Sequence, residues 1–247
     1  MNKIIKLKKS NKIYVTAHRG ASKEAAENSL LAFYKAIEIG ADLIEMDIHL
    51  TKERNIVVIH DANTKRVGDK FLVIKESTYD QIQEVNLKDN QKIPLLDEVF
   101  EKFKGKIGFV IEIKANNLAE ILVDKIKEYD VYDSCIIISF KHKELIKFKQ
   151  LIKEIPVATL EPTGSSILSG WFLRNKMLNN VNSLGFDGIH PYYKFVNKNF
   201  VENAHKLNLF VNPWTVDNEN IMRDLIQMNV DGITTNDPRK LISILNQ

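Results

Sequence analysis

Short runs of apolar and β-branched residues alternate with amphipathic helical patterns along nearly the whole chain. The candidate strands are Ile13–Ala17, Leu43–Asp47, Ile107–Lys114, Cys135–Phe140, Val157–Glu161, Gly188–Pro191, Leu209–Trp214 and Gly232–Thr235. The helical patterns between them include Ser29–Ile39, Leu118–Tyr129, Lys143–Ile152, Asn197–Lys206, Glu219–Met228 and Pro238–Leu245. Eight such alternations predict an α/β fold, a single (β/α)8 TIM barrel that spans residues 1–247 as one domain. A doubly wound open sheet is the alternative, because its local pattern is the same.

The alternation is irregular between the second and third candidate strands. There the sequence predicts an extra strand, a polar loop and a short helix near Asp80–Val85. We interpret residues 62–94 as a small insertion over the mouth of the barrel. At the helix ends, Asn28 is expected to cap the Ser29–Ile39 helix, and Gly40 is expected to end it.

Composition argues against several classes of protein. The 35 basic and 32 acidic residues leave a formal net charge of +3, too small to predict a nucleic-acid partner. The single cysteine, Cys135, lies in an apolar run and is expected to be a buried, inert thiol. No run of about 18 apolar residues and no signal-peptide pattern occurs, so we expect no transmembrane segment and a cytoplasmic location.

Two carboxylates occupy alternate positions in the second candidate strand. Glu45 and Asp47 alternate with Ile44, Met46 and Ile48. Both carboxylates should therefore face one side of the strand, while the apolar side chains pack on the other. Neighbouring carboxylates repel each other unless a positive charge lies between them. This pattern is typical of a binding site rather than of a core.

A third carboxylate, Glu112, lies on the next barrel strand. Three oxygen ligands from two strands, with no cysteine, fit a hard divalent cation such as Mg²⁺ or Ca²⁺. Arg19 and Lys114 would hold an anion beside that cation. His18 and His60, at strand ends, could transfer protons near neutral pH. This set predicts phosphoryl-ester chemistry; the structural alternative is that Glu112 only pairs with Lys114 and the histidines are ordinary strand-end residues.

Four other histidines have different expectations. His49 shares the strand face of the first two carboxylates and could reach the metal, although it should lie past the ordered strand. His190 ends the sixth candidate strand and could line a substrate pocket. His142 and His205 lie among lysines in helical patterns, so we expect both on the solvated surface.

Several segments resemble glycerophosphodiester phosphodiesterases. The match begins with AHRGA at residues 17–21 and continues through ENSLLAFYKAIEIGADLIEMDIHLTKERNIVVIHD at residues 27–61. IPLLDEVF, the EIK around Glu112, PWTV and DGITTNDP extend the resemblance over nearly the whole chain. Members of that family are TIM barrels that hydrolyse glycerophosphodiesters to glycerol 3-phosphate and an alcohol with a divalent cation.

The resemblance implies a role for each matching residue. It implies Glu45, Asp47 and Glu112 as metal ligands. It implies His18 as the base and His60 as the acid. It implies that Arg19 and Lys114 hold the phosphate and that Glu27 and Asn28 support the site. It also implies that Trp214 lines the glycerol pocket.

The chain departs from the family pattern at a few positions. Arg54 stands in place of the customary turn glycine, so this turn is expected to be reshaped. Asp217 replaces the asparagine that often follows Trp-Thr-Val, which changes the local hydrogen bonds. Residues 62–91 match poorly and lack the large subdomain of some members, so substrate preference is least defined there.

Two rival functions remain open at this stage. One is a lysophospholipase D or sphingomyelinase D type of lipid phosphodiesterase, in which Trp171 and Phe172 of the segment SSILSGWFLRNKM would touch acyl chains. The other is a non-catalytic barrel that binds phosphodiesters. The presence of two histidines with three carboxylates argues against the second rival, since pure binding needs no proton transfer. The small-molecule partner expected from all of these is a phosphodiester.

Overall fold

The computed structural model describes residues 12–162 and 170–247. The strands are β1 (Tyr14–Ala17), β2 (Leu43–Leu50), β3 (Ile56–Val58), β4 (Gly108–Ile113), β5 (Cys135–Ser139), β6 (Val157–Glu161), β7 (Gly188–Pro191), β8 (Phe210–Val211) and β9 (Gly232–Thr235). The helices are α2 (Leu30–Ile39), α3 (Tyr79–Gln83), α4 (Leu96–Phe103), α5 (Ala119–Tyr129), α6 (His142–Leu151), α7 (Gly170–Ser183), α8 (Lys198–Lys206), α9 (Glu219–Gln227) and α10 (Pro238–Leu245). Helices α4 and α7 were not among the helical patterns specified from the sequence.

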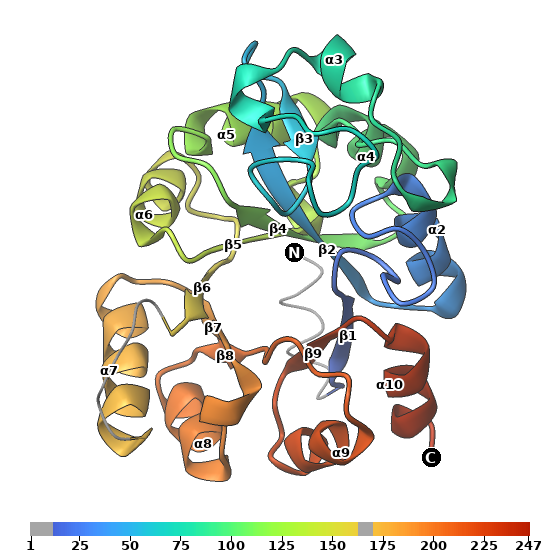
Figure 1. Ribbon diagram of the computed structural model, residues 1–247. Helices are drawn as coiled ribbons and strands as arrows, with labels where there is room; N and C mark the ends of the chain where they lie inside the picture. The colour runs from blue at the N-terminus through green and yellow to red at the C-terminus, as the bar shows by residue number, and fades with distance from the viewer. Residues whose placement is uncertain (1–11, 163–169) are drawn as a thin grey trace.

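Eight of these strands form a parallel ring in the order β8-β7-β6-β5-β4-β2-β1-β9. Backbone hydrogen bonds from Asp231 N to Val211 O (3.0 Å) and from Thr234 N to Pro213 O (2.9 Å) join the two ends of this order. Figure 1 shows the strands around a common centre with the helices outside them. The predicted (β/α)8 barrel is therefore confirmed, and the open-sheet alternative is wrong because the sheet curls back on itself.

The strand alternation divides apolar residues between two cores. Ile44, Met46 and Ile48 are fully buried between the sheet and the helices, as their positions predict. The opposite face points into the barrel, where a second cluster includes Tyr14 and Phe210. This interior is packed tightly at β9, because a Cβ at Gly232 would lie only 2.1 Å from a Tyr14 ring carbon. The barrel interior is thus a filled core at this level, and the room for a ligand lies toward its open end.

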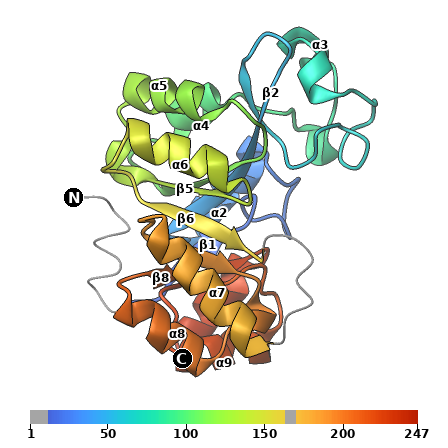
Figure 2. The same cartoon turned by 90° about the vertical axis from the view of Figure 1, so that its left-hand side faces the viewer.

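The insertion follows β2 and packs on that strand. β3 runs antiparallel to β2, with Ile48 opposite Val58. Residues 62–94 then fold around their own apolar cluster, which includes Ile74, Ile82 and Val85. Figure 2 shows this segment, with α3, standing out beyond the body of the barrel. The insertion and its short helix occur where the sequence predicts them, although α3 begins and ends slightly earlier than expected.

The first helix begins one residue later than the sequence pattern suggested. Ser29, rather than Asn28, is the N-cap of α2, and its Oγ accepts a hydrogen bond from Ala32 N at 3.1 Å. Asn28 instead has a left-handed backbone (φ 55°) that turns its side chain toward the barrel. Gly40 ends the helix in the left-handed conformation, as predicted. Within the described residues, every helix is too short or too polar to cross a membrane.

Candidate active site

The three predicted metal-binding carboxylates meet at the carboxyl end of the barrel. Asp47 on β2 is the direct parallel neighbour of Glu112 on β4, and Glu45 lies two residues earlier on the same face of β2. One carboxylate oxygen from each residue lies within 4.8 Å of the others, and all three side chains are buried. Strand alternation and register alone therefore assemble the cluster.

The charges of this cluster are poorly compensated. Burial raises the pKa of Glu45 well above its usual range, and burial together with the charge of Asp47 raises the pKa of Glu112 to about 8. For Asp47, burial is outweighed by Arg19 and Lys114, whose charges lower its pKa to about 2. Three buried carboxylates whose negative charges repel one another are suitable ligands for a hard divalent cation. Asp47 Oδ1, buried without a hydrogen bond, also fits that use.

Two cations border the carboxylates. The left-handed backbone of Arg19 (φ 56°) lets its N–H donate to Glu45 Oε2 at 2.9 Å while its guanidinium lies 3.2 Å from Asp47 Oδ2. Lys114 Nζ lies 2.9 Å from Glu112 Oε1 and 3.5 Å from Asp47 Oδ1. The Glu112–Lys114 pair of the structural alternative is thus formed, but within a larger cluster. Both cations lie where an anion beside the carboxylates would need them.

His18 is oriented by the amide side chain of Asn236, directly after β9. Asn236 Nδ2 donates to Asp217 Oδ2 at 2.6 Å, and a carboxylate only accepts, so Asn236 Oδ1 faces His18 Nδ1 at 2.7 Å. The His18 proton therefore resides on Nδ1, and the Nε2 lone pair is left toward Glu45, 4.0 Å away. Burial, and after it the charge of Arg19, lower the pKa of His18 to about 4, so the ring is neutral at pH 7. Asp217, which departs from the family pattern, thus provides the hydrogen-bond acceptor for Asn236.

His60 is held by a carboxylate instead. Its Nδ1 lies 2.6 Å from Asp61 Oδ1, while Arg66 Nε donates to Asp61 Oδ2 at 2.7 Å. The remaining nitrogens of Arg66 donate to both oxygens of Glu27 at 2.7 Å, and Glu27 also accepts from Arg19 at 2.8 Å. A continuous network therefore links Arg19 to the second histidine. His60 lies two residues beyond β3, which is shorter than the predicted strand.

Seven of the ten predicted site residues line one small cavity of about 90 Å³. Polar walls come from both histidines, Arg19, Lys114 and two of the carboxylates, and apolar walls from Ile138, Phe140, Leu160 and Trp214. Trp214 lies three residues beyond the short strand β8, and its indole N–H donates to His190 O at 2.7 Å. His190 itself is buried in the wall, and burial lowers its pKa to about 3. The two imidazoles and the carboxylate cluster thus share a common cavity.

The other sequence expectations have mixed outcomes. Asn28 Nδ2 donates to Asp47 Oδ2 at 2.9 Å, so it orients a carboxylate. His49 lies outside the carboxylate group, and its Nε2 is 3.0 Å from His60 O, because β3 folds back over it. His142 is mostly buried and 3.5 Å from Glu161, and His205 pairs with Asp231 at 2.9 Å, so neither is a free surface histidine.

Sequence reasoning missed three site residues: Asp61, Arg66 and Asn236. A carboxylate directly after a strand-end histidine was a usable signal for Asp61, since such pairs orient imidazoles. Asn236 stands in the DGITTNDP segment, which the resemblance included without giving it a role. Arg66 had no local signal, because its partners lie on other segments.

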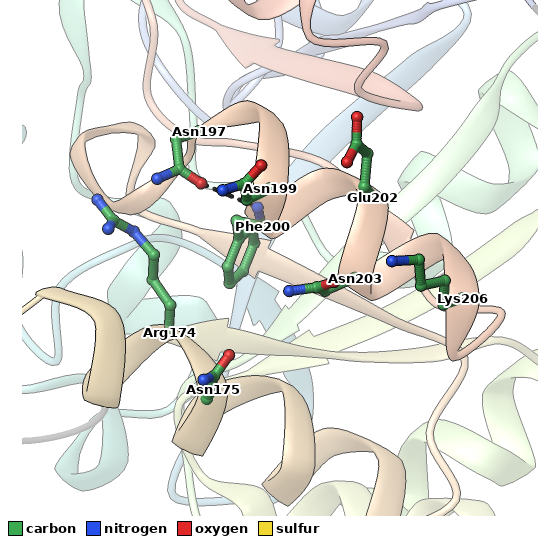
Figure 3. Close-up of a pocket in the computed structure, with 8 residues that line it drawn as sticks. All are labelled: Arg174, Asn175, Asn197, Asn199, Phe200, Glu202, Asn203 and Lys206. Carbon is green, nitrogen blue, oxygen red and sulfur yellow. Dashed lines mark hydrogen bonds between the residues drawn. The ribbon is translucent and has the colours of Figure 1, made fainter.

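A separate hollow of about 300 Å³ lies between α7 and α8. Figure 3 shows Arg174 and Asn175 on one helix facing Asn199, Asn203 and other residues of α8 across it. Half of its eight lining residues are asparagines, and none is a predicted site residue. It is therefore distinct from the carboxylate cavity.

The comparisons with known proteins agree with this geometry. A model of the glycerophosphoryl diester phosphodiesterase family matches residues 18–240. A glycerophosphodiester phosphodiesterase of Caldanaerobacter subterraneus is 35% identical over 249 residues, covering 96% of this chain and 99% of the relative. A crystal structure of a glycerophosphodiester phosphodiesterase from Parabacteroides distasonis is 29% identical with a TM-score of 0.81, covering 95% of this chain and 97% of that one.

A more distant likeness concerns the lipid-cleaving alternative. A human lysophospholipase D is 36% identical over 126 residues, which cover 45% of this chain and 39% of the relative. The full-length matches, by contrast, extend across every strand that carries a site residue. The chain therefore belongs to the glycerophosphoryl diester phosphodiesterase family, and it is an enzyme of the class that the sequence predicted.

Proposed function

We propose that the chain hydrolyses glycerophosphodiesters to glycerol 3-phosphate and an alcohol, with a divalent cation and with His18 and His60 as base and acid. The observation that carries this proposal is one cavity lined by two differently held imidazoles, two cations and two carboxylates, with the third carboxylate, Asp47, beside those two. Each group alone has a structural explanation. Their convergence at the open end of a barrel favours catalysis.

The metal would be Mg²⁺ or Ca²⁺, held by Glu45, Asp47 and Glu112. When bound, such a cation supplies Lewis-acid polarisation of a phosphoryl oxygen. Asn28 would keep Asp47 oriented for that purpose through its 2.9 Å hydrogen bond. Arg19 and Lys114 would hold the other phosphoryl oxygens, offsetting the negative charge that builds on them in the transition state.

His18 suits the role of base because its free lone pair is on Nε2. Its Nδ1 proton is committed to the Asn236 carbonyl oxygen. Nε2 would take the proton of the attacking hydroxyl, either the glycerol 2-hydroxyl next to the phosphodiester or a water molecule. With the 2-hydroxyl, the oxygen–phosphorus bond that forms gives a cyclic phosphate, which water then opens to glycerol 3-phosphate.

His60 suits the role of acid because its Nδ1 partner is the carboxylate of Asp61, which stabilises a positively charged ring. His60 would donate its Nε2 proton to the departing alcohol oxygen as the phosphorus–oxygen bond breaks. Without that proton an alkyl alcohol would leave as a high-energy alkoxide. The proton that His18 gains and the one that His60 loses balance. When water opens the cyclic phosphate, His60 would take a proton from that water and His18 would return its proton to the 2-oxygen, so both rings are restored.

The glycerol would lie against the apolar wall of the small cavity. Trp214 is fixed there by its bond to His190 O and by an edge contact with Phe140, with ring centroids 5.5 Å apart. His190 Nε2 is buried without a hydrogen bond, so it is placed to contact a glycerol hydroxyl. A cavity of about 90 Å³ suits a group of glycerol size.

The lysolipid alternative has weaker support. The segment expected to touch acyl chains lies partly in residues 163–169, outside the described residues, and the human lysophospholipase D matches under half of the chain. Hydrolysis of glycerophosphocholine but not of its lysolipid counterpart would support the glycerophosphodiester assignment. The cytoplasmic location expected from the sequence stays a prediction.

One screen tests the proposal directly. Glycerophosphodiesters with different alcohols would be incubated with the protein and Mg²⁺ or Ca²⁺ in turn, with coupled detection of glycerol 3-phosphate. We expect turnover with at least one cation, and the preferred cation identifies the metal. Absence of glycerol 3-phosphate from every substrate under both cations would refute the proposal.

A further inference from the structure

A second, larger hollow adjoins the catalytic cavity. It has a volume of about 680 Å³ and shares two lining residues, His60 and Lys114, with the small cavity. Trp214 lines the small cavity but not the larger hollow. If His60 protonates the departing oxygen, the alcohol attached to that oxygen extends into the larger hollow. This inference rests on the proposed function and concerns the part of the substrate that varies.

The lining of the larger hollow has an excess of positive charge. Lys65, Arg66 and Lys114 are its cations, and Asp61 is its only acid among the described residues. Both oxygens of Asp61 are already engaged, one by His60 and one by Arg66. The one acid of the lining is therefore already paired with two cationic or potentially cationic side chains, which weakens its attraction for a cationic alcohol.

Among the three cations of the lining, Lys65 is the one whose charge is not paired with a described carboxylate. Arg66 is neutralised between Glu27 and Asp61, and Lys114 is paired with Glu112. Lys65 is exposed and forms no ion pair with any residue in the described ranges 12–162 and 170–247. Its ammonium group is free to meet an anionic ligand.

The hollow also lacks the side chains that recognise quaternary ammonium groups. Such groups bind over the faces of Trp, Tyr or Phe. Among the described residues, none of those that line the hollow is Trp, Tyr or Phe. The aromatic residues of the site, Phe140 and Trp214, line the small cavity instead. The larger hollow therefore offers the trimethylammonium group of choline no Trp, Tyr or Phe face to bind.

We propose that the larger hollow is the subsite for the departing alcohol, that it favours alcohols carrying their own negative charge, such as a phosphorylated polyol, and that Lys65 determines this preference. The expected size follows from Coulomb's law. The phosphate would lie within hydrogen-bond distance of the exposed ammonium, or one water molecule away, in a water-like dielectric that salt partly screens. A substrate that carries this phosphate should therefore have a kcat/KM about three- to tenfold higher.

Two substrates that differ only by one phosphate test this subsite: glycerophosphoinositol and glycerophosphoinositol 4-phosphate. With the divalent cation fixed and saturating, wild-type kcat/KM should be about three- to tenfold higher for the phosphorylated substrate at about 0.05 M salt. The ratio should fall toward one at about 1 M salt. Lys65→Gln should bring it near one at low salt, and Lys65→Glu should invert it.

A matched control comes from the same insertion. Lys70 is exposed but paired with Glu84 at 3.1 Å and does not line the hollow, so Lys70→Gln should keep the wild-type ratio. Equal kcat/KM for both substrates in the wild type, or a ratio that the Lys65 variants leave unchanged, would overturn the subsite inference alone. If neither substrate released glycerol 3-phosphate, the proposed function would fail, and this inference with it.

Discussion

Replacing Asp61 by asparagine should weaken His60 as the acid while leaving the rest of the site in place. Asp61 accepts from His60 Nδ1 on one oxygen and from Arg66 Nε on the other. Asparagine offers one acceptor oxygen and one amide that only donates, so one of these two donors would face another donor. The protonated form of His60 would also lose its neighbouring negative charge.

The expected loss can be sized from this geometry. A hydrogen bond to a charged group contributes about 1.5–3 kcal/mol. The His60 and Asp61 side chains are 30% and 28% exposed, so solvent screening puts the pair near the lower end, about 1.5–2 kcal/mol. If this stabilisation acts on the protonated ring in the transition state, kcat for an alkyl alcohol substrate should fall about ten- to thirtyfold.

The assay compares two leaving groups. Glycerophosphoglycerol must release an alkoxide-like oxygen and needs the acid, whereas glycerophospho-4-nitrophenol releases a stable phenolate and does not. Asp61→Asn should therefore slow the first substrate about ten- to thirtyfold and the second by less than about threefold. Asp80→Asn, an exposed carboxylate change in the same insertion, is the control. Equal slowing of both substrates by Asp61→Asn would refute the assignment of His60 as acid.

Three further outcomes are expected. His18→Ala should lower kcat by about 10²–10⁴ with an unchanged melting temperature, and undiminished turnover would refute its role as base. Exhaustive EDTA treatment should abolish activity, which added Mg²⁺ or Ca²⁺ should restore; activity that survives chelation would show that the carboxylate cluster does not hold an essential metal. Gly232→Ala should cost about 1–3 kcal/mol of folding free energy in urea denaturation, because its Cβ would lie 2.1 Å from the Tyr14 ring. An unchanged unfolding midpoint for that variant would contradict the tight barrel interior.

Local periodicity was enough to predict the part of the site that lies on strands. Side chains in a strand alternate with a period of two, so Glu45 and Asp47 had to share one face, opposite the buried Ile44 and Met46. The position of Glu112 beside them needed only the expectation that consecutive parallel strands are neighbours. These predictions succeeded because each depends on interactions within a strand or between two adjacent ones.

Predictions about single polar side chains outside strands were less successful. Asn28 has a residue type that caps helices, yet the cap is Ser29, because the left-handed backbone of Asn28 directs its amide to Asp47. Residue type alone cannot choose between these partners. His142 and His205 were expected in solvent because of the lysines next to them in the sequence. Their acidic partners, Glu161 and Asp231, lie on other elements, so local sequence could not reveal them.

The sequence by itself determined the barrel pattern, the insertion and the family, since all three depend on order along the chain. Only the tertiary structure decided how the two histidines differ. His18 and Asn236 are 218 residues apart, and they meet because each directly follows one of the paired parallel strands β1 and β9. His60 receives its network through Arg66, which the folded insertion brings to Glu27. A hydrogen bond between distant segments depends on where the fold places them, so no local pattern could have predicted which imidazole meets an amide and which a carboxylate.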